Sequence, residues 1–286
     1  MMTPPCKKID IHAHVTPAEL REESNMITSE DLLPLYDELN IEMGVILPFY
    51  SARKHGGVNT PENARLVCER YPERFARFTS VDLSRPEWTF DALERFLAGE
   101  KEAGALGVGE ITTKLYFDDP KVDALFSLSS ELELPLLFHV TPDFEARYGV
   151  VDEPGLVRLE KMLKRHPKAL VLGHSQPFWK AIGSGEASDP SRRLARLMRE
   201  CPNLLCDLSA GSGSKAMMRD RDYAAAFLTE FSHRVFYGCD ICQSANSHFR
   251  PFAAFFDDLL ADGMISEETY RLVARENALR VLFERN

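Results

Sequence analysis

Eight short apolar segments recur along the chain at a nearly even spacing, and a helical pattern follows each of them. The predicted strands are residues 8–13, 43–48, 76–82, 106–111, 136–140, 169–174, 204–209 and 234–240. Strands that alternate with helices indicate a parallel sheet. Several strands are continuous apolar runs, such as Leu136–Phe138, which is typical of strands covered on both faces. Eight such units favour a closed α/β (β/α)8 TIM barrel over an open doubly wound sheet.

Turn and cap residues mark where the intervening helices begin. Thr60 precedes Pro61, and proline follows Asp119 and Asp189 in the same way. The predicted helices are residues 30–39, from 61 onward, 88–103, from 120 to 134, 154–166, from 190 to about 201, 215–231, 249–261 and 267–284. No low-complexity linker interrupts this series, so we expect one domain over residues 1–286.

The acidic charge balance argues against nucleic acid as a partner. Lys and Arg number 34 against 44 Asp and Glu, and the net charge of −10 would repel a phosphate backbone. No apolar run approaches the ~18 residues that a membrane span needs, and the N-terminus lacks a signal-peptide pattern. We therefore expect a cytoplasmic protein that acts on a small-molecule substrate, without nucleic acid or membrane partners. A homo-oligomer stays open, and the six cysteines are expected to be reduced thiols.

Four histidines and one aspartate fall at the carboxyl ends of predicted strands. They are His12, His14, His139, His174 and Asp240. In a parallel barrel the carboxyl ends of all strands meet at one rim, so residues from the whole chain would converge there. Imidazole nitrogens with a carboxylate suit Zn²⁺, Fe²⁺ or Mn²⁺.

A single histidine at a strand end is usually structural, and an isolated His-x-His pair is a weak signal. The coincidence of all five residues with strand ends favours a metal site. The other histidines do not share the pattern and are expected in loops or at helix ends: His55, His166, His233 and His248.

The segments around these residues resemble those of the amidohydrolase superfamily. The likeness spans the chain and is closest to the amidohydrolase-related (family 2) group that includes aminocarboxymuconate-semialdehyde decarboxylase. The segments that carry it are residues 9–14, 138–140, 173–174, 238–240 and 276–283.

The resemblance implies roles for the predicted ligands. His12, His14 and Asp240 would bind a first divalent metal, zinc before manganese or iron. With one ion, His139 would complete the coordination, and His174 would polarise substrate or water. With two ions, His139 and His174 would hold the second ion.

Glu110 lies on the fourth strand, where some members of the superfamily place a carboxylate that bridges two metals. The resemblance therefore favours Glu110 as a further metal ligand. The alternative is a solvent-facing carboxylate or one paired with Lys114.

Two reactions fit this set of residues. The leading hypothesis is hydrolysis of an amide, ester or lactone by a metal-activated water, with Asp240 accepting the proton of that water. The alternative is metal-dependent, non-oxidative decarboxylation of an aromatic or unsaturated carboxylic acid. Phosphoester hydrolysis is disfavoured by the acidic charge balance, and a non-enzymatic scaffold by the presence of the ligand set.

Several weaker features lie near the predicted rim. Asp10 is either a hydrogen-bonding partner of the site or an interior residue. The Gly211–Ser214 run would bind an anion or form a flexible loop, and Cys239 and Cys242 are expected to be free thiols. Loop side chains would shape a substrate pocket or merely pack: Phe49, Tyr50, Arg53, Lys54, His55, Lys114, Tyr116, Phe178, Trp179 and Lys180.

Overall fold

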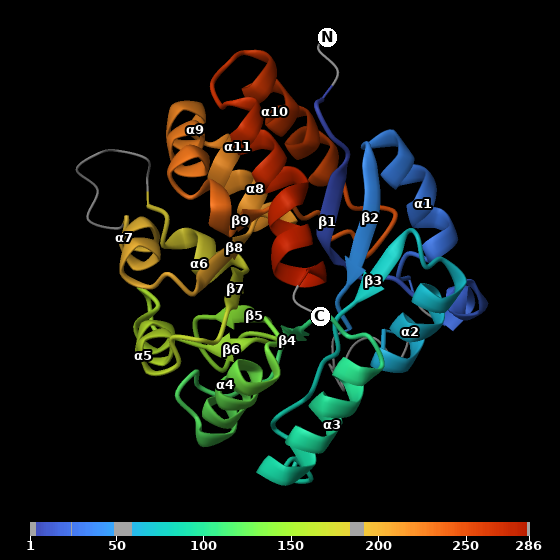
Figure 1. Ribbon diagram of the computed structural model, residues 1–286, viewed down its shortest axis with the longest axis vertical. Coiled ribbons are helices and arrows are strands. Elements are labelled where there is room, and N and C mark those ends of the chain that lie inside the picture. The colour runs from blue at the N-terminus through green and yellow to red at the C-terminus, as the bar shows by residue number, and fades with distance from the viewer. Residues whose placement is uncertain (1–3, 24, 49–58, 184–191, 285–286) are drawn as a thin grey trace. The chain divides into compact units, whose positions relative to one another are not determined.

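Parallel strands alternate with helices along the described part of this computed structural model, residues 4–23, 25–48, 59–183 and 192–284 (Figure 1). The chain divides into two compact units. The first combines residues 1–46, 62–76 and 206–286, and the second combines residues 47–61 and 77–205. The expectation of one domain over residues 1–286 stays a prediction.

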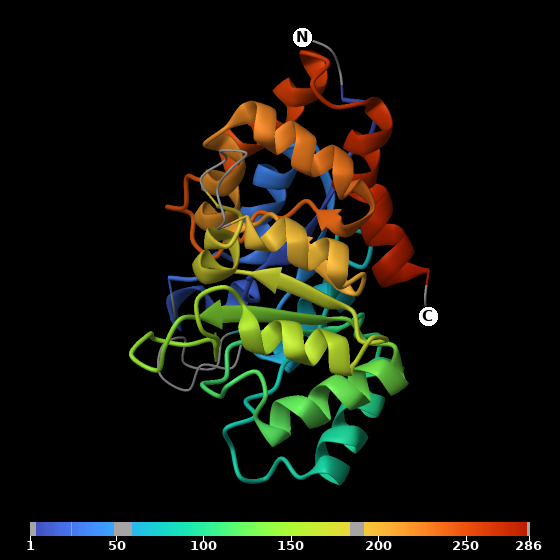
Figure 2. The same cartoon turned by 90° about the vertical axis from the view of Figure 1, so that its left-hand side faces the viewer.

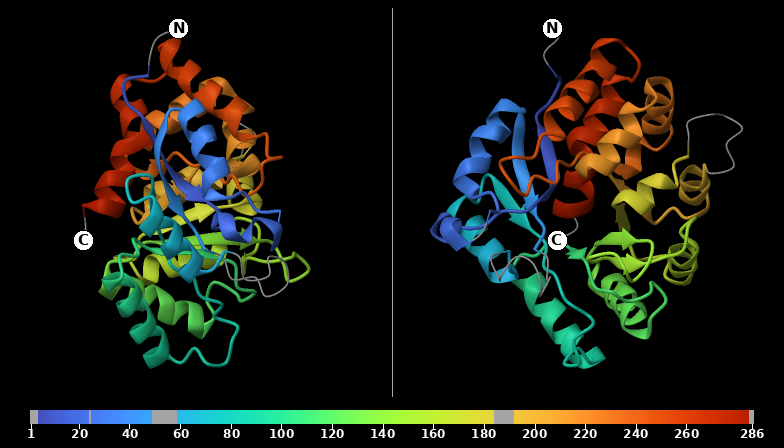
Figure 3. Two further views of the ribbon diagram at one scale, coloured as in Figure 1. Left: turned by 90° about the vertical axis from the view of Figure 1, so that its right-hand side faces the viewer. Right: turned by 180° about the vertical axis from the view of Figure 1, so that it is seen from behind.

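The first unit is built around the parallel pair β1 (Lys8–Ala13) and β2 (Ile41–Ile46), which lie side by side with α1 (Ser29–Glu38) next to them (Figures 1 and 3). The pairing runs from Lys8 opposite Ile41 to Ala13 opposite Ile46. The short strand β3 (Phe75–Arg77) extends this sheet, and the end of β8 (Leu204–Asp207) pairs in parallel with β9 (Val235–Phe236).

The second unit contains β4 (Val108–Ile111), β5 (Leu136–Thr141) and β7 (Val171–His174), all parallel. Figure 2 shows the arrows of β5 and β7 running in the same direction. The short strand β6 (Val150–Val151) also pairs with β5. The β5–β7 register places His139 directly opposite His174, which sets two of the predicted ligands side by side.

Helices follow the strands in both units. The first unit has α2 (Pro61–Arg70), α8 (Ala210–Met218), α9 (Arg221–Glu230), α10 (Phe249–Ala261) and α11 (Glu267–Arg271). The second has α3 (Phe90–Glu102), α4 (Pro120–Leu132), α5 (Val157–Arg165), α6 (Gln176–Lys180) and α7 (Arg193–Glu200).

Local hydrogen bonds explain why several helices begin where they do. The side chain of Thr28 accepts a bond from the Asp31 backbone at the start of α1, and that of Thr89 accepts one from Ala92 at the start of α3. Asp119 does the same before Pro120, as the sequence predicts for α4.

Three expectations about the elements are wrong. The single helix predicted over residues 215–231 is two helices, because Asp220 adopts an extended backbone and caps α9 with its side chain. The Gly211–Ser214 run is helical and belongs to the first turns of α8. The last predicted helix changes to π-helical turns at Leu272–Glu276 and Leu279–Phe283.

Among the described residues, no helix has the length and apolar character needed to cross a bilayer. None of the six cysteines, all of which the structure describes, forms a disulfide, and the expectation of reduced thiols stays a prediction. The residues that would start the helix predicted from position 190, Ser188–Pro190, lie outside the described residues.

Candidate metal centre

Three predicted ligands of the first unit lie within coordination range of one another. The Nε2 atoms of His12 and His14 are 3.0 Å apart. An oxygen of Asp240 lies 3.8 Å from the first and 3.4 Å from the second. Donor atoms on one tetrahedral ion with bonds of about 2.0–2.2 Å lie roughly 3.3–3.6 Å apart, so this triangle fits a divalent metal such as Zn²⁺.

The backbone of the first unit explains how these side chains meet. His12 and His14 are two residues apart at the end of a strand, so they project from the same face. The Asp240 N–H donates to the His12 carbonyl over 2.8 Å, and Ala13 bridges to Ile241. Asp240 itself has a φ of 53°, an uncommon value that aspartate tolerates better than most residues.

Asp10 hydrogen-bonds to both of these segments. Its Oδ1 accepts the backbone N–H groups of His12 (3.0 Å) and Cys239 (2.8 Å), and its Oδ2 accepts the Tyr36 hydroxyl (2.7 Å). Burial raises the pKa of Asp10 to about 6, although these three bonds lower it. Asp10 therefore fits both alternatives, because it is fully buried and also hydrogen-bonds to the backbone of the predicted ligand His12.

A second carboxylate, which the strand-end argument did not single out, contacts His12 directly. Asp207 Oδ2 lies 2.6 Å from His12 Nδ1, and neither side chain is exposed. Asp207 ends β8, just as the predicted ligands end or follow other strands. The predicted strand continues to residue 209, so Asp207 lies before its predicted end, and the strand-end argument does not point to it.

The predicted ligands of the second unit form another cluster. Glu110, His139 and His174 each offer a donor atom within 4.8 Å of the others. Their positions follow from the parallel strands β4, β5 and β7, which carry one of these residues each. The prediction that both clusters join in one site stays a prediction.

Within this cluster, Glu110 forms a close contact with the ring of His139. Its Oε1 lies 2.6 Å from His139 Nδ1 and 3.8 Å from His174 Nε2. The side chain is nearly inaccessible, and Lys114 donates to the Phe144 carbonyl instead. The alternatives of a solvent-facing or Lys114-paired Glu110 are therefore wrong.

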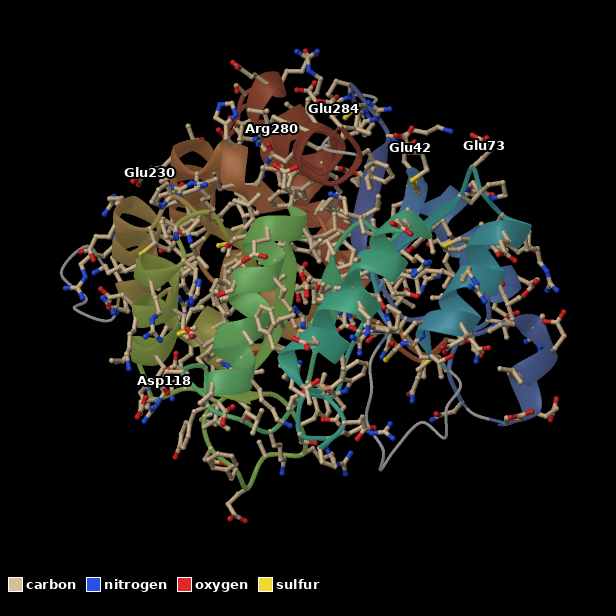
Figure 4. All side chains as sticks on the ribbon, turned by 60° about the horizontal axis from the view of Figure 1, so that its bottom comes forward. Glu42, Glu73, Asp118, Glu230, Arg280 and Glu284 are labelled. Carbon is tan, nitrogen blue, oxygen red and sulfur yellow. The ribbon has the colours of Figure 1, made fainter. Side chains whose placement is uncertain are left out.

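Most of the described side chains that were predicted to shape a pocket are buried in the fold or contact neighbouring side chains and backbone groups. Phe178 and Trp179 are buried in α6, which explains why an aromatic run in a predicted loop does not line a surface. Tyr116 is exposed, and its ring lies edge-on to that of Phe144. The Cζ atom of Arg158 lies 4.1 Å from the centre of the Tyr116 ring. Arg158 also bonds to Asp118, labelled in Figure 4. The predicted pocket residues of the second loop, residues 49–55, lie outside the described residues.

Three of the remaining histidines also keep to structural roles. His166 bonds to Asp123 at the end of α5, and His248 bonds to the Cys239 carbonyl over 2.7 Å. His233 sits in a single 3-10 turn before β9.

Comparison with known sequences decides the family. Residues 9–283 match the sequence profile of a family described as Amidohydrolase. This chain belongs to the amidohydrolase family. A search of curated protein sequences finds no significant match to this chain.

Similar solved structures confirm the (β/α)8 barrel fold. A TIM-barrel protein from Bordetella bronchiseptica has a TM-score of 0.69 at 16% identity, covering 96% of this chain and 98% of its own. A dihydroxybenzoic acid decarboxylase from Polaromonas sp. JS666, with bound manganese and the inhibitor 2-nitroresorcinol, scores 0.64 at 16% identity over 98% of each chain. A probable 2-pyrone-4,6-dicarboxylic acid hydrolase from Acinetobacter baumannii scores 0.63 at 16% identity, covering 96% of this chain and 99% of its own.

Proposed function

We propose that this amidohydrolase is a metal-dependent, non-oxidative decarboxylase of a small aromatic or unsaturated carboxylic acid. The observation that carries the proposal is the 2.6 Å contact between Glu110 Oε1 and His139 Nδ1. This revises the leading expectation of hydrolysis, which rested on the full ligand set together with Glu110 as a metal ligand.

The contact length supports a hydrogen bond over shared coordination. Charge-assisted N–H···O bonds are about 2.7–2.9 Å long, whereas two ligands on one tetrahedral ion lie roughly 3.3–3.6 Å apart. A Glu110 that accepts the Nδ1 proton of His139 orients the ring and leaves Nε2 as its metal-binding atom. A single ion then suffices, and the bridging role disappears.

We further propose that His12, His14, His139 and Asp240 hold this one ion, zinc or alternatively manganese or iron. The proposal is supported by the family and by the geometry of parallel barrels, whose strand ends meet at one rim. When bound, a divalent cation supplies positive charge that orients the substrate and stabilises negative charge developing on its oxygens.

The chain's own residues would then handle the proton. Decarboxylation breaks the bond between the carboxylate carbon and the ring, CO₂ leaves, and the electron pair stays on the ring carbon until a proton arrives there. We assign proton delivery to His174, because imidazole exchanges protons near neutral pH and Asp240 is committed as a ligand.

Hydrolysis remains the second candidate because of one observation. Glu110, His139 and His174 lie close enough together to hold a second ion among themselves. In that arrangement Asp240 would accept the proton of the attacking water, and the substrate would be an amide, ester or lactone.

A direct comparison of the two reactions tests the proposal. Protein stripped of metal and reloaded with Zn²⁺ or Mn²⁺ is incubated with dihydroxybenzoic acids, related aromatic acids and 2-pyrone-4,6-dicarboxylic acid. We expect loss of an aromatic acid with equimolar CO₂, one ion per chain by elemental analysis, and no turnover in Asp240→Asn. Lactone opening without CO₂, or two ions per chain, would overturn the decarboxylase assignment in favour of hydrolysis.

A further inference from the structure

The first unit contains a buried carboxylate to which the proposed chemistry gives no role. Asp207 is fully buried, and its two oxygens receive separate donors. Oδ1 accepts the Ser209 backbone N–H over 3.0 Å. Oδ2 accepts the Ser209 hydroxyl over 2.7 Å and faces His12 Nδ1 at 2.6 Å. A buried charge is stable only when paired in this way, so the arrangement fixes which His12 nitrogen carries a proton.

Gly238 provides an independent sign that space at this position is reserved for Asp207. A Cβ atom placed on Gly238 would lie 2.5 Å from Asp207 Oδ1 and 2.9 Å from the Cβ of Ser209. It would also lie 3.5 Å from the Cβ of His12. A hydrogen atom is the only substituent that leaves Asp207 and Ser209 in place. The glycine of the 238–240 segment is thus explained by room for the carboxylate.

We infer that Asp207 is a positioning residue that holds His12 in the tautomer with its proton on Nδ1, so that Nε2 presents a lone pair to the metal. Ser209 fixes Asp207, and Gly238 makes room for it. The inference rests on the metal-binding part of the proposed function and is independent of which reaction follows. Carboxylate partners of this kind orient ligating histidines and raise their basicity.

The hydrogen-bond pattern specifies what Asp207→Asn would do. An asparagine can present its oxygen either to the Ser209 N–H or to His12, but not to both. With the oxygen on Ser209, the amide N–H points at His12 Nδ1 and drives the ring proton to Nε2, where the metal should bind. With the oxygen on His12, the amide faces the Ser209 N–H and one buried bond is lost. Both arrangements weaken metal binding without removing a ligand.

The experiment measures metal affinity rather than turnover. The Kd for Zn²⁺ is obtained by competition with a chromogenic chelator for wild type, Asp207→Asn, Ser209→Ala and the control Asp152→Asn. Asp152 is also a buried carboxylate, but it accepts backbone N–H groups from Arg158 and Leu159 in the other unit. We expect a 10- to 100-fold higher Kd for Asp207→Asn, a smaller increase for Ser209→Ala, and no change for Asp152→Asn.

A second readout separates positioning from general destabilisation. With Co²⁺ in place of Zn²⁺, the visible absorption bands report ligand geometry, and we expect them to change in Asp207→Asn and to stay constant in Asp152→Asn. If Asp207→Asn does not fold, Ser209→Ala and Gly238→Ala carry the same test. Wild type that binds no metal would overturn the proposed function itself. Wild type that binds tightly while both Asp207→Asn and Ser209→Ala bind equally well would overturn only the role of Asp207.

Discussion

Glu110→Gln distinguishes the two proposed reactions at a single position. In the decarboxylase arrangement, Glu110 is a hydrogen-bond partner of His139, so the variant keeps every ligand and binds one ion per chain more weakly. In the hydrolase arrangement, Glu110 is itself a ligand, so the variant loses one of two ions. A lower affinity is expected in both arrangements, so the number of ions bound per chain by the variant decides between them.

The expected loss of affinity follows from the contact length. The 2.6 Å bond between His139 Nδ1 and Glu110 Oε1 is slightly shorter than the charge-assisted N–H···O range of about 2.7–2.9 Å, so we treat it as a bond to a charged group. Bonds to charged groups contribute about 1.5–3 kcal/mol. A 10- to 100-fold rise in Kd, the usual effect of removing such a partner, corresponds to about 1.4–2.7 kcal/mol. The two estimates agree, so we expect the Kd for Zn²⁺ to rise 10- to 100-fold.

Titration calorimetry with Zn²⁺ gives the number of ions bound per chain and the Kd for wild type and Glu110→Gln, with Asp152→Asn as the control. We expect one site in all three proteins and a weaker site only in Glu110→Gln. Two sites in wild type and one in Glu110→Gln would refute the interpretation of the short contact. An unchanged Kd would show that the bond to His139 does not support metal binding.

Three further predictions concern other parts of the chain. Gly173→Ala places a Cβ 2.0 Å from a ring carbon of the buried Phe178, so thermal unfolding should show a loss of roughly 1–3 kcal/mol, whereas exposed Gly99→Ala, with nothing within 4 Å, should be neutral or stabilising. Asp240→Ala should abolish tight metal binding in dialysis with a chelator, while the chain keeps its far-ultraviolet circular dichroism. Burial raises the pKa of Asp152 from 3.8 to about 6, so the folded state binds its proton more tightly than the unfolded state does. Its stabilising contribution is complete below the unfolded pKa and is lost as pH rises through 6, by about 1.4 kcal/mol between pH 5 and 7.5. Burial raises the pKa of Asp10 to about 6 as well, so urea unfolding at both pH values should show a loss of stability that is smaller by this amount in Asp152→Asn than in wild type.

The strands could be predicted from sequence because their signal is local. Continuous apolar runs such as Leu136–Phe138 and 171–172 form strands with the predicted order and direction. The division between α8 and α9 was harder, because residues 215–231 are helix-forming throughout and only the extended backbone of Asp220 separates them. Whether an aromatic run is buried also depends on how the chain turns after the strand, as the packing of the Phe178 ring over Gly173 shows.

The candidate ligands could be predicted for the same reason, since their positions at strand ends are visible in the sequence. Their partners could not. The pairing of His12 with Asp207 joins residues 195 positions apart, and the choice of His139 over Lys114 by Glu110 depends on side-chain rotamers. No local pattern encodes either contact. Sequence therefore proposes which residues form a site, while the structure shows that the Nδ1 atoms of His12 and His139 are engaged by carboxylates.

The two carboxylate–histidine pairs share one design, and this similarity bears on the reaction. Asp207 with His12 and Glu110 with His139 have the same bonded atom, Nδ1, and the same length of 2.6 Å. If Glu110 were a bridging ligand, His139 would lack the partner that His12 has, and its ring would be oriented by packing alone. Asp207 cannot be a bridging ligand in either scheme, so its contact with His12 serves only to orient that ring. The simplest account gives Glu110 the same orienting role toward His139. Held through Nδ1, His12 and His139 each offer one nitrogen, Nε2, to an ion. With Glu110 engaged as the partner of His139, no carboxylate bridge joins two ions, and this favours the single metal of the proposed decarboxylase.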